Sequence, residues 1–370
     1  VTLLNFTDIH AQLLPVYYRE PSSNLGVGEM RGLPPHISGK ALLEKFGLKA
    51  GSPEAYAFTH NDFERLAREY GRVGGVAHLA TLINSIRTER PGRTLLLDCG
   101  DTWQGSYTSL QTRGMDMVEV MNALGVEMMT AHWEFTYGEE RVRELIEKLA
   151  FPFLAGNVVD TEWEEDVFEH TATFERGGVN IAVIGQAFPY TPVANPRHMI
   201  PKWSFGIRDE KIQQRVDEAR ASGADLVVLA SHNGFDVDRK MASRVSGIDV
   251  IFTGHTHDAI PALVPVGNTL LVAAGSHGKF LARLDLEVKN KRIARHAFRL
   301  IPVFSDAIPA DPEMASLVKK VRAPYEKACN EELATTDSLL YRRGHFNGTF
   351  DDLICNAILQ ERDCEIALSP

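Results

Sequence analysis

The chain has 370 residues, of which 44% are hydrophobic and 24% charged, as expected for a globular protein larger than one ordinary domain. Its formal net charge of −10 argues against non-specific nucleic-acid binding and provides no general attraction for an anionic substrate. No apolar run approaches the ~18 residues that a membrane-spanning helix requires. The four cysteines lack Cys-x-x-Cys spacing, which argues against a zinc ribbon or a thioredoxin-like motif.

Short apolar runs alternate with amphipathic patterns along most of the chain, which predicts a layered α/β fold. Predicted strands that end at a polar residue cover 1–7, 94–97, 126–130, 226–230 and 250–253. The helices expected between them cover about 75–88, 139–149, 209–222 and 236–245. Three successive strands are then expected at 269–274, 280–288 and 297–303.

The Pro- and Asp-bearing stretch at 306–312 is the predicted domain boundary. A first domain at 1–305 precedes a linker at 306–335, with a helix at about 313–333, and the start of a C-terminal domain at 336–370. An insertion at about 11–70 separates the first strand from its helix, and its length predicts local structure or a function of its own. Residues 365–368 are predicted to form a strand. We expect the sequence to continue beyond Pro370 and to start at a processed N-terminus.

Aspartate and histidine side chains cluster at the predicted strand ends, where layered α/β folds bind ligands. Residues i and i+2 of an extended segment share a face, so the Asp8-His10 and His255-His257 pairs each direct two side chains to one place. The predicted ligands are Asp8, His10, Asp101, His132, His232, His255 and His257. These nitrogen and oxygen donors suit manganese, zinc or iron. Two such ions, typically ~3.5–4 Å apart, need a shared carboxylate, for which we select Asp101.

Residues 131–138, Ala-His-Trp-Glu-Phe-Thr-Tyr-Gly, resemble the Gly-Asn-His-Glu-Phe-Asp-Tyr-Gly signature of the 5′-nucleotidase-type metallophosphoesterases. The resemblance implies an α/β/β/α sandwich with two metal ions and a bridging hydroxide held by Asp101. It assigns one ion to Asp8, His10, Asp101 and His257, and the other to Asp101, His132, His232 and His255.

The general-acid position of that signature is altered. The family's acid is a histidine oriented by an aspartate three residues later, and these positions hold Trp133 and Thr136, which give up no proton near neutral pH. An alkoxide, whose conjugate acid has a pKa near ~15.7, needs an acid or a metal contact to leave. A thiol has a pKa near ~8.5, and the difference of roughly 7 units corresponds to about 10 kcal/mol. The acid is therefore dispensable when the broken bond is to sulfur.

The chain is similar over essentially its whole length to the SoxB-type thiosulfohydrolases, the sulfur-oxidation branch of that superfamily. Residues 132–138, 275–280 and 344–352 and the insertion after His10 carry the resemblance. It implies a periplasmic enzyme with two Mn²⁺ ions, or alternatively Zn²⁺, and a thiosulfonated carrier protein of the Sox system as partner. The enzyme would hydrolyse the terminal sulfonate from a cysteine S-thiosulfonate and release sulfate. The resemblance also implies that the domain at 1–305 is the catalytic domain and that a substrate domain starts at 336–370.

Two other functions stay open at this point. One is a 5′-nucleotidase or 2′,3′-cyclic-nucleotide phosphodiesterase of the same superfamily, and the other is a non-catalytic protein that inherited the fold. Trp133, Arg72 and Asn157 are the candidates for substrate contacts, because they lie next to predicted strand ends or the metal site. Lys279 is predicted to be a surface charge.

Overall fold

The computed structural model describes residues 1–342 and 347–369. They form two compact units, the first made of Val1–Val16 and Val73–Tyr325, the second of Tyr17–Arg72 and the described part of 326–370. Within these residues, no helix is both long and apolar enough to cross a membrane. The motif at 344–352 is described only from Asn347, since residues 344–346 lie outside the described residues.

The first unit contains the strands. They are β1 Thr2–Phe6, β2 Thr94–Asp98, β3 Met128–Met129, β4 Val159–Asp160, β5 Thr171–Arg176, β6 Val179–Gln186, β7 Trp203–Ser204, β8 Leu226–Ser231, β9 Val250–Thr253, β10 Val264–Val266, β11 Thr269–Ala273, β12 Phe280–Lys289 and β13 Arg292–Pro302. One sheet has the order β13-β12-β1-β2-β3, a second has β10-β11-β9-β8-β6-β5, and β4 pairs with β7. The strands β1, β2 and β3 are parallel, as are β6, β8, β9 and β11.

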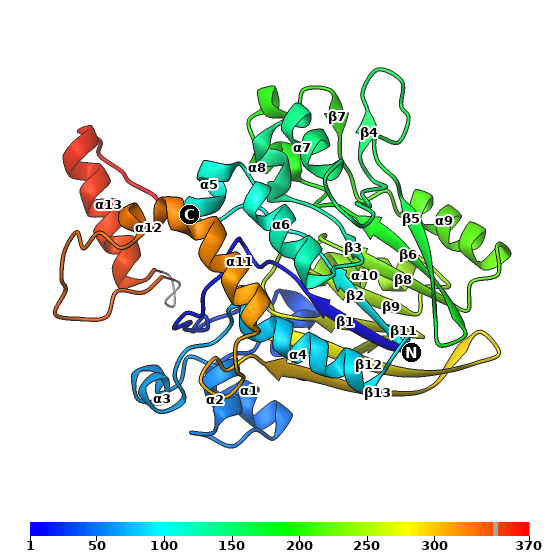
Figure 1. Ribbon diagram of the computed structural model, residues 1–370, viewed down its shortest axis with the longest axis horizontal. Helices are drawn as coiled ribbons and strands as arrows, with labels where there is room; N and C mark the ends of the chain where they lie inside the picture. The colour runs from blue at the N-terminus through cyan, green and yellow to red at the C-terminus, as the bar shows by residue number, and fades with distance from the viewer. Residues whose placement is uncertain (343–346, 370) are drawn as a thin grey trace. The chain divides into compact units, whose positions relative to one another are not determined.

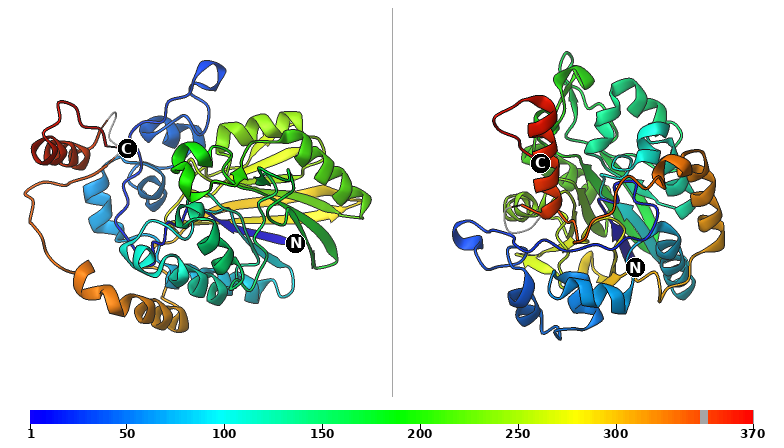
Figure 2. Two further views of the ribbon diagram at one scale, coloured as in Figure 1. Left: turned by 90° about the horizontal axis from the view of Figure 1, so that it is seen from above. Right: turned by 90° about the vertical axis from the view of Figure 1, so that its left-hand side faces the viewer.

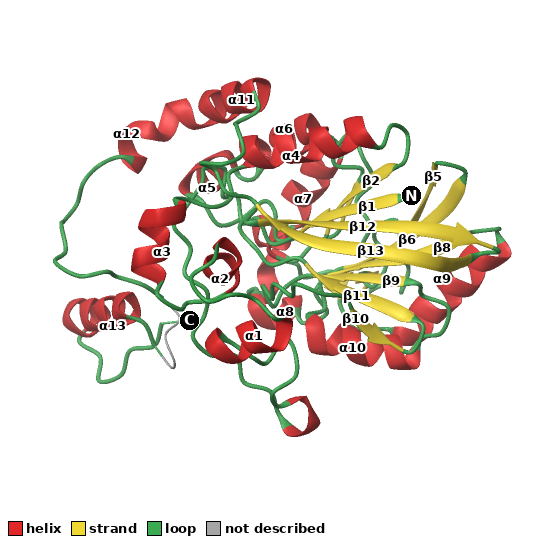
Figure 3. Cartoon of the chain, turned by 90° about the horizontal axis from the view of Figure 1, so that it is seen from below, coloured by secondary structure: helices red, strands yellow, loops and turns green. Residues whose placement is uncertain are grey.

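The helices of the first unit are α4 Val76–Glu89, α5 Tyr107–Thr112, α6 Met115–Leu124, α7 Glu139–Ile146, α8 Thr191–Ala194, α9 Asp209–Ala221, α10 Phe235–Arg244 and α11 Pro312–Arg322. Short 3₁₀ turns lie at Trp133–Tyr137, Arg197–Met199 and Ala323–Tyr325. Apolar side chains of α4, α6 and α11 pack with those of β1 and β2 in one core, and α9 and α10 pack on the second sheet. The two sheets thus lie between two helical layers (Figure 1, Figure 2 and Figure 3).

The central strands consist almost entirely of buried apolar residues, as expected for strands covered on both faces. Every residue of β1, β2, β8 and β9 is buried. Apart from Thr2, Asn5 and Thr94, the residues before the strand ends are apolar, so the charged side chains stand at or beyond the carboxyl ends. The predicted layered α/β class is confirmed.

The second unit contains η1 Gly28–Met30, α1 Gly39–Phe46, α2 Pro53–Phe58, α3 Phe63–Tyr70, α12 Glu326–Cys329 and α13 Thr349–Arg362. The insertion therefore has helices of its own. Tyr56 packs against Phe63 and Tyr70, and its hydroxyl donates to the Gly71 carbonyl at 2.7 Å. The insertion belongs to the same unit as the residues after Tyr325. The sequence interpretation instead attached the insertion to the catalytic domain. That residues 336–370 begin a substrate domain stays a prediction.

Two elements differ from expectation. The helix expected at about 313–333 ends as α11 at Arg322, because Pro324 cannot continue an α-helix. The strand expected at 365–368 does not form, because these residues pair with no other strand in the described part of the chain.

Helix α11 begins at a side-chain cap that can be tested. Asp311 accepts the backbone N–H of Met314 at 2.9 Å, and Pro312 occupies the first helical position. Asp311→Ala should lower the free energy of unfolding by about 1 kcal/mol, measured by urea denaturation. Asp306→Ala, an exposed change before the helix, should alter it by less than about 0.5 kcal/mol. Equal effects of the two substitutions would contradict the cap.

Candidate metal centre

The carboxyl ends of five parallel strands, from both sheets, bring together seven aspartate and histidine residues. The ladder between β1 and β2 continues past the strand ends, where Asp8 N–H donates to Gly100 O at 2.9 Å and His10 N–H to Asp101 O at 2.8 Å. His232 follows β8 directly, and its N–H donates to Gln186 O at 2.8 Å. The backbones that carry Asp8, His10 and His232 are thus fixed by hydrogen bonds to the neighbouring strand or the loop that follows it.

Two donor groups share Asp101. In each group the ligand atoms lie within 4.8 Å of one another. The first donor group is Asp8, His10, Asp101 and His257, and the second donor group is Asp101, His132, His232 and His255. These are the seven residues, in the same two sets, that the sequence interpretation names. Asp101 Oδ2 lies 3.1 Å from His132 Nδ1, 3.1 Å from His232 Nε2 and 3.6 Å from His10 Nε2.

Most of these residues adopt a strained backbone. Left-handed φ angles occur at Asp8 (51°), His10 (50°), Asp101 (56°), His255 (77°) and His257 (58°). Non-glycine residues rarely adopt this region, and such strain collects at functional sites. The tight turns let neighbouring residues of one loop direct their side chains into the same small volume.

Backbone carbonyls orient two of the imidazoles. His232 Nδ1 lies 2.6 Å from Cys99 O, and His10 Nδ1 lies 3.1 Å from Gln104 O. A carbonyl oxygen only accepts hydrogen bonds, so each Nδ1 carries a hydrogen and each Nε2 is the atom that faces the Asp101 carboxylate and can bind a metal ion once it holds no proton. Metal-binding histidines commonly have this outer hydrogen bond.

Glu134 joins the loop of Asp101 to the loop of His132. It is 0% exposed, and its carboxylate accepts the N–H groups of Thr102 at 2.6 Å, Trp103 at 3.2 Å and His132 at 2.7 Å. Glu134 lies within the motif at 131–138, but the motif by itself indicates no role for it. The sequence did contain a signal for this role. An acidic residue between the mostly apolar residues Ala131 and Phe135 is expected to be buried, and a buried carboxylate needs hydrogen-bond donors.

The charges at the centre are strongly coupled. Burial opposes ionisation of Asp8, but the neighbouring His232 and His257 outweigh it and lower the pKa of Asp8 to about 2. Burial also disfavours the charged form of His232, yet Asp101 and Asp8 raise its pKa to about 10. Burial, with His232 and His132, lowers the pKa of His255 to about 3. Two ionised carboxylates therefore attract positive charge, which a divalent cation supplies in competition with the proton on His232.

The donor set fits a pair of divalent ions. Imidazole nitrogens and carboxylate oxygens converge at the centre, and His132 Nε2 is buried without a hydrogen-bond partner among the described residues. Each group offers four nitrogen or oxygen atoms, and the shared Asp101 places the two groups side by side. The nearby Cys99 thiol bonds to Phe252 O and Asn5. The donors therefore match the predicted dinuclear site without selecting a metal.

Comparison with known proteins identifies the family. No family model matches the sequence. Bovine 5′-nucleotidase is 26% identical over 335 residues, a match that covers 81% of the chain and 57% of the relative. The chain thus spans little more than half the length of the curated relatives that it matches. Sulfate thiohydrolase SoxB from Thermus thermophilus, solved in complex with glycerol, is 37% identical with a TM-score of 0.93, over 97% of this chain and 67% of that one.

The chain belongs to the SoxB-type branch of the 5′-nucleotidase/metallophosphoesterase superfamily. A 5′-nucleotidase precursor from Thermus thermophilus, at 22% identity and a TM-score of 0.76, shares the fold over 98% of the chain. This membership places the chain among metal-dependent hydrolases and confirms the resemblance read from the sequence.

The acid position of this SoxB-type chain holds no proton donor for a leaving group. The backbone N–H of Trp133 donates to Asp101 Oδ1 at 2.8 Å, and the centroid of the indole ring lies 4.7 Å from that of the His132 ring. The Thr136 hydroxyl donates to Asn195 Oδ1 at 3.1 Å. Both residues are committed to contacts within the chain.

The other two residues predicted to contact substrate, Asn157 and Arg72, lie in different surroundings from Trp133. Asn157 is 0% exposed, its amide hydrogens bond to Ala187 O at 2.8 Å and Gly206 O at 2.9 Å, and its Oδ1 accepts the Ala187 N–H at 2.8 Å. Asn157 therefore has a structural role instead of a substrate contact. Arg72 is exposed at the end of the Tyr17–Arg72 segment, in the second unit.

Lys279 was predicted to be a surface charge, and this was wrong. It is 1% exposed, and its Nζ lies 5.0 Å from the centroid of the Phe280 ring. The backbone forces this position, because Lys279 N–H donates to Ser276 O and its carbonyl accepts from Val303 at the start of the β12–β13 pairing. His277, two residues earlier, lies 5.5 Å from the rings of both His10 and His257 and belongs to neither donor group.

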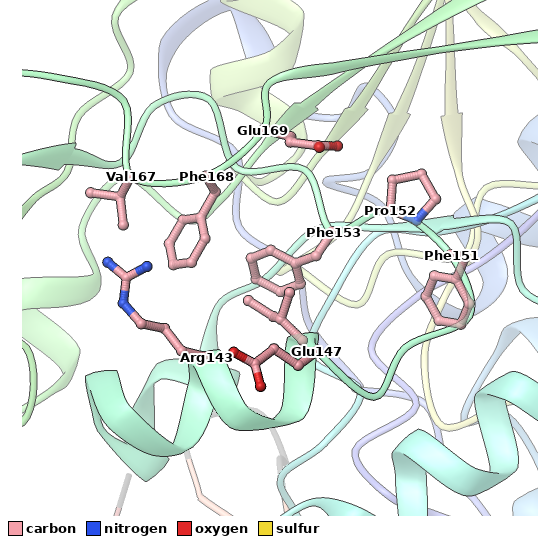
Figure 4. A pocket seen from close by; sticks show the side chains of 9 residues that line it. Arg143, Glu147, Phe151, Pro152, Phe153, Val167, Phe168 and Glu169 are labelled. Carbon is pink, nitrogen blue, oxygen red and sulfur yellow. The ribbon is translucent and has the colours of Figure 1, made fainter.

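A pocket of about 360 Å³ lies apart from the donor groups (Figure 4). The rings of Phe151, Phe153 and Phe168 line it together with charged side chains of Arg143 and Glu147. None of the seven donors lines this pocket. The metal centre is therefore identified by its donor atoms and not by this hollow.

Gly254 provides a test of how tightly the centre is packed. A methyl group there would stand 2.6 Å from Thr7 Oγ1, 2.9 Å from His232 Nδ1 and 3.0 Å from Asp8 Oδ2. Gly254→Ala should weaken metal binding at least about fivefold, since overpacking costs about 1–3 kcal/mol. Isothermal titration calorimetry and metal counting would measure this. Gly206→Ala, whose methyl finds only ordinary contacts, should bind metal normally, and unchanged binding in Gly254→Ala would refute the packing.

Proposed function

We propose that this chain is the catalytic part of a thiosulfohydrolase of the Sox sulfur-oxidation pathway. It would act on a cysteine S-thiosulfonate on a carrier protein: Cys-S-S-SO₃⁻ + H₂O → Cys-S-SH + HSO₄⁻. The bond between the sulfonate sulfur and the adjacent sulfur breaks, and its electron pair leaves with the adjacent sulfur. The sulfonate sulfur forms a new bond to the oxygen of water.

The observation that carries this proposal is the chemistry of Trp133 and Thr136. Neither side chain ionises near neutral pH, and both residues are engaged in contacts within the chain. A persulfide or thiolate leaves as a stable anion and needs no acid, whereas an alkoxide does. The membership in the SoxB-type branch supports the same conclusion.

The seven donor residues would hold two Mn²⁺ ions, with Zn²⁺ as the alternative. Two ions held by these residues would supply a bound water of lowered pKa and stabilisation of negative charge. Asp101 would serve both ions, Glu134 would keep its loop in register with His132, and the carbonyls of Cys99 and Gln104 would keep His232 and His10 in the ligating tautomer. A periplasmic location and a thiosulfonated carrier as partner belong to the same proposal.

Local charge explains how an acidic protein accepts a sulfonate. The chain carries a net charge of −10, but two divalent ions beside the carboxylates of Asp8 and Asp101 would leave the centre positive. Attraction of the anion is therefore confined to the strand ends.

Sulfate release tests the proposal directly. The Mn²⁺-loaded protein should release sulfate from a thiosulfonated cysteine peptide, measured by ion chromatography, and the chelator-treated protein should release none until Mn²⁺ is restored. Turnover of AMP or a 2′,3′-cyclic nucleotide without sulfate release would instead establish the nucleotidase alternative. Absence of both activities in a protein holding two metal ions would favour a binding function.

Restoring the acid tests the leaving-group argument. Trp133→His combined with Thr136→Asp should raise hydrolysis of a phosphate monoester at least about tenfold, because a general acid contributes typically ~10²–10⁴-fold. Sulfate release should not rise, since the sulfur anion needs no proton. Trp133→Phe is the control that changes the ring and adds no acid. A parallel gain in both reactions would show that the acid matters equally for sulfur.

A further inference from the structure

We infer that Phe188, with Trp133 and Tyr190, forms an aromatic wall beside the second donor group that selects a sulfonate attached to an apolar, sulfur-bearing chain. The inference rests on the proposed function and extends it to substrate specificity. Trp133 is a substrate-contact candidate from the sequence, whereas Phe188 and Tyr190 are identified only by the structure.

Phe188 is in close contact with two of the second group's histidines. Its ring stacks on that of His255 at 4.0 Å between centroids and 30° between planes. It lies 4.1 Å from the ring of His132 at 49°. His132 also contacts Trp133 at 4.7 Å. A hydrocarbon face therefore borders these imidazoles, without adding a charge or a metal ligand to the centre.

The chain fixes the position of Phe188 firmly. Its N–H donates to Ala131 O at 3.0 Å, and its carbonyl accepts the Thr191 hydroxyl at 2.8 Å. The preceding residue, Ala187, is held through both its N–H and its carbonyl by the buried Asn157 amide. The role of Asn157 is thus to hold the segment that carries the wall.

The wall extends from the buried centre to the surface. Phe188 is 8% exposed, whereas Tyr190 is 50% exposed, and their rings lie 5.8 Å apart at 73°. A substrate chain whose sulfonate reaches the centre from this side passes along aromatic faces.

Such a wall discriminates by chemistry. Divalent sulfur makes favourable contacts with aromatic rings at about 5 Å. A hydroxylated chain, such as the ribose of a nucleotide, loses hydrogen bonds to water against the same face and finds few replacements. The wall would therefore favour the carrier's sulfur chain and disfavour a nucleotide, independently of the missing acid.

Two stable sulfonates that differ only in their chains provide the test. Calorimetry would compare methylthiomethanesulfonate, CH₃-S-CH₂-SO₃⁻, with the hydroxylated 2-hydroxyethanesulfonate on the Mn²⁺-loaded protein. The wild type should bind the thioether at least about fivefold more tightly. Phe188→Ala should lose this preference while keeping two metal ions, Phe188→Tyr should keep it, and Phe174→Ala, a half-buried aromatic outside the centre, should not alter it.

Phe188→Leu covers the case in which the alanine variant is unstable, since it keeps apolar volume without the ring and should also reduce the preference. Two outcomes would overturn the inference: equally weakened binding of both sulfonates, or loss of metal in both the alanine and leucine variants. Either would show that Phe188 only supports the histidines. The binding assay requires no turnover. A Phe188-dependent preference in a protein that releases no sulfate would refute the proposed function alone, and sulfate release without such a preference would refute the wall alone.

Discussion

The charge of two buried carboxylates constrains the rest of this structure. Asp8 and Asp101 are almost wholly buried, and an unpaired ion in a protein interior is strongly unfavourable. Asp8 receives the hydroxyl of Thr7 and the N–H of His255, while Asp101 receives the N–H of Trp133 and faces three imidazoles. These donors compensate the charge only in part, which makes the centre a strong site for divalent cations.

The fold brings the strand ends of two sheets together, so that histidines from both sheets lie close to the two carboxylates. Strands such as β1 and β8 contain no charged residue, so the charged and metal-ligating side chains appear only where the strands end. Left-handed residues then turn the ligand loops inward, at a conformational energy that the surrounding hydrogen bonds must offset. Glu134 contributes three of these bonds and connects two loops that are about thirty residues apart in sequence.

The residues around the second donor group are apolar and aromatic, whereas the donors themselves are polar or charged. Trp133 and Phe188 place hydrocarbon against His132, where a nucleotidase would have an ionisable acid at the first of these positions. An apolar border and an absent acid both suit a leaving group that is polarisable and departs as an anion. The altered signature is thus coherent with hydrolysis of a bond to sulfur.

The sequence by itself determined the layered α/β fold, the donor residues at the strand ends and the change at Trp133 and Thr136. These features depend on local periodicity and residue type, which a linear sequence displays. Only the tertiary structure decided that Asn157 and Lys279 are buried, that Glu134 joins two ligand loops and that Phe188 stacks on His255. Burial, hydrogen-bond partners and ring contacts are set by segments distant in sequence, so no local pattern reveals them.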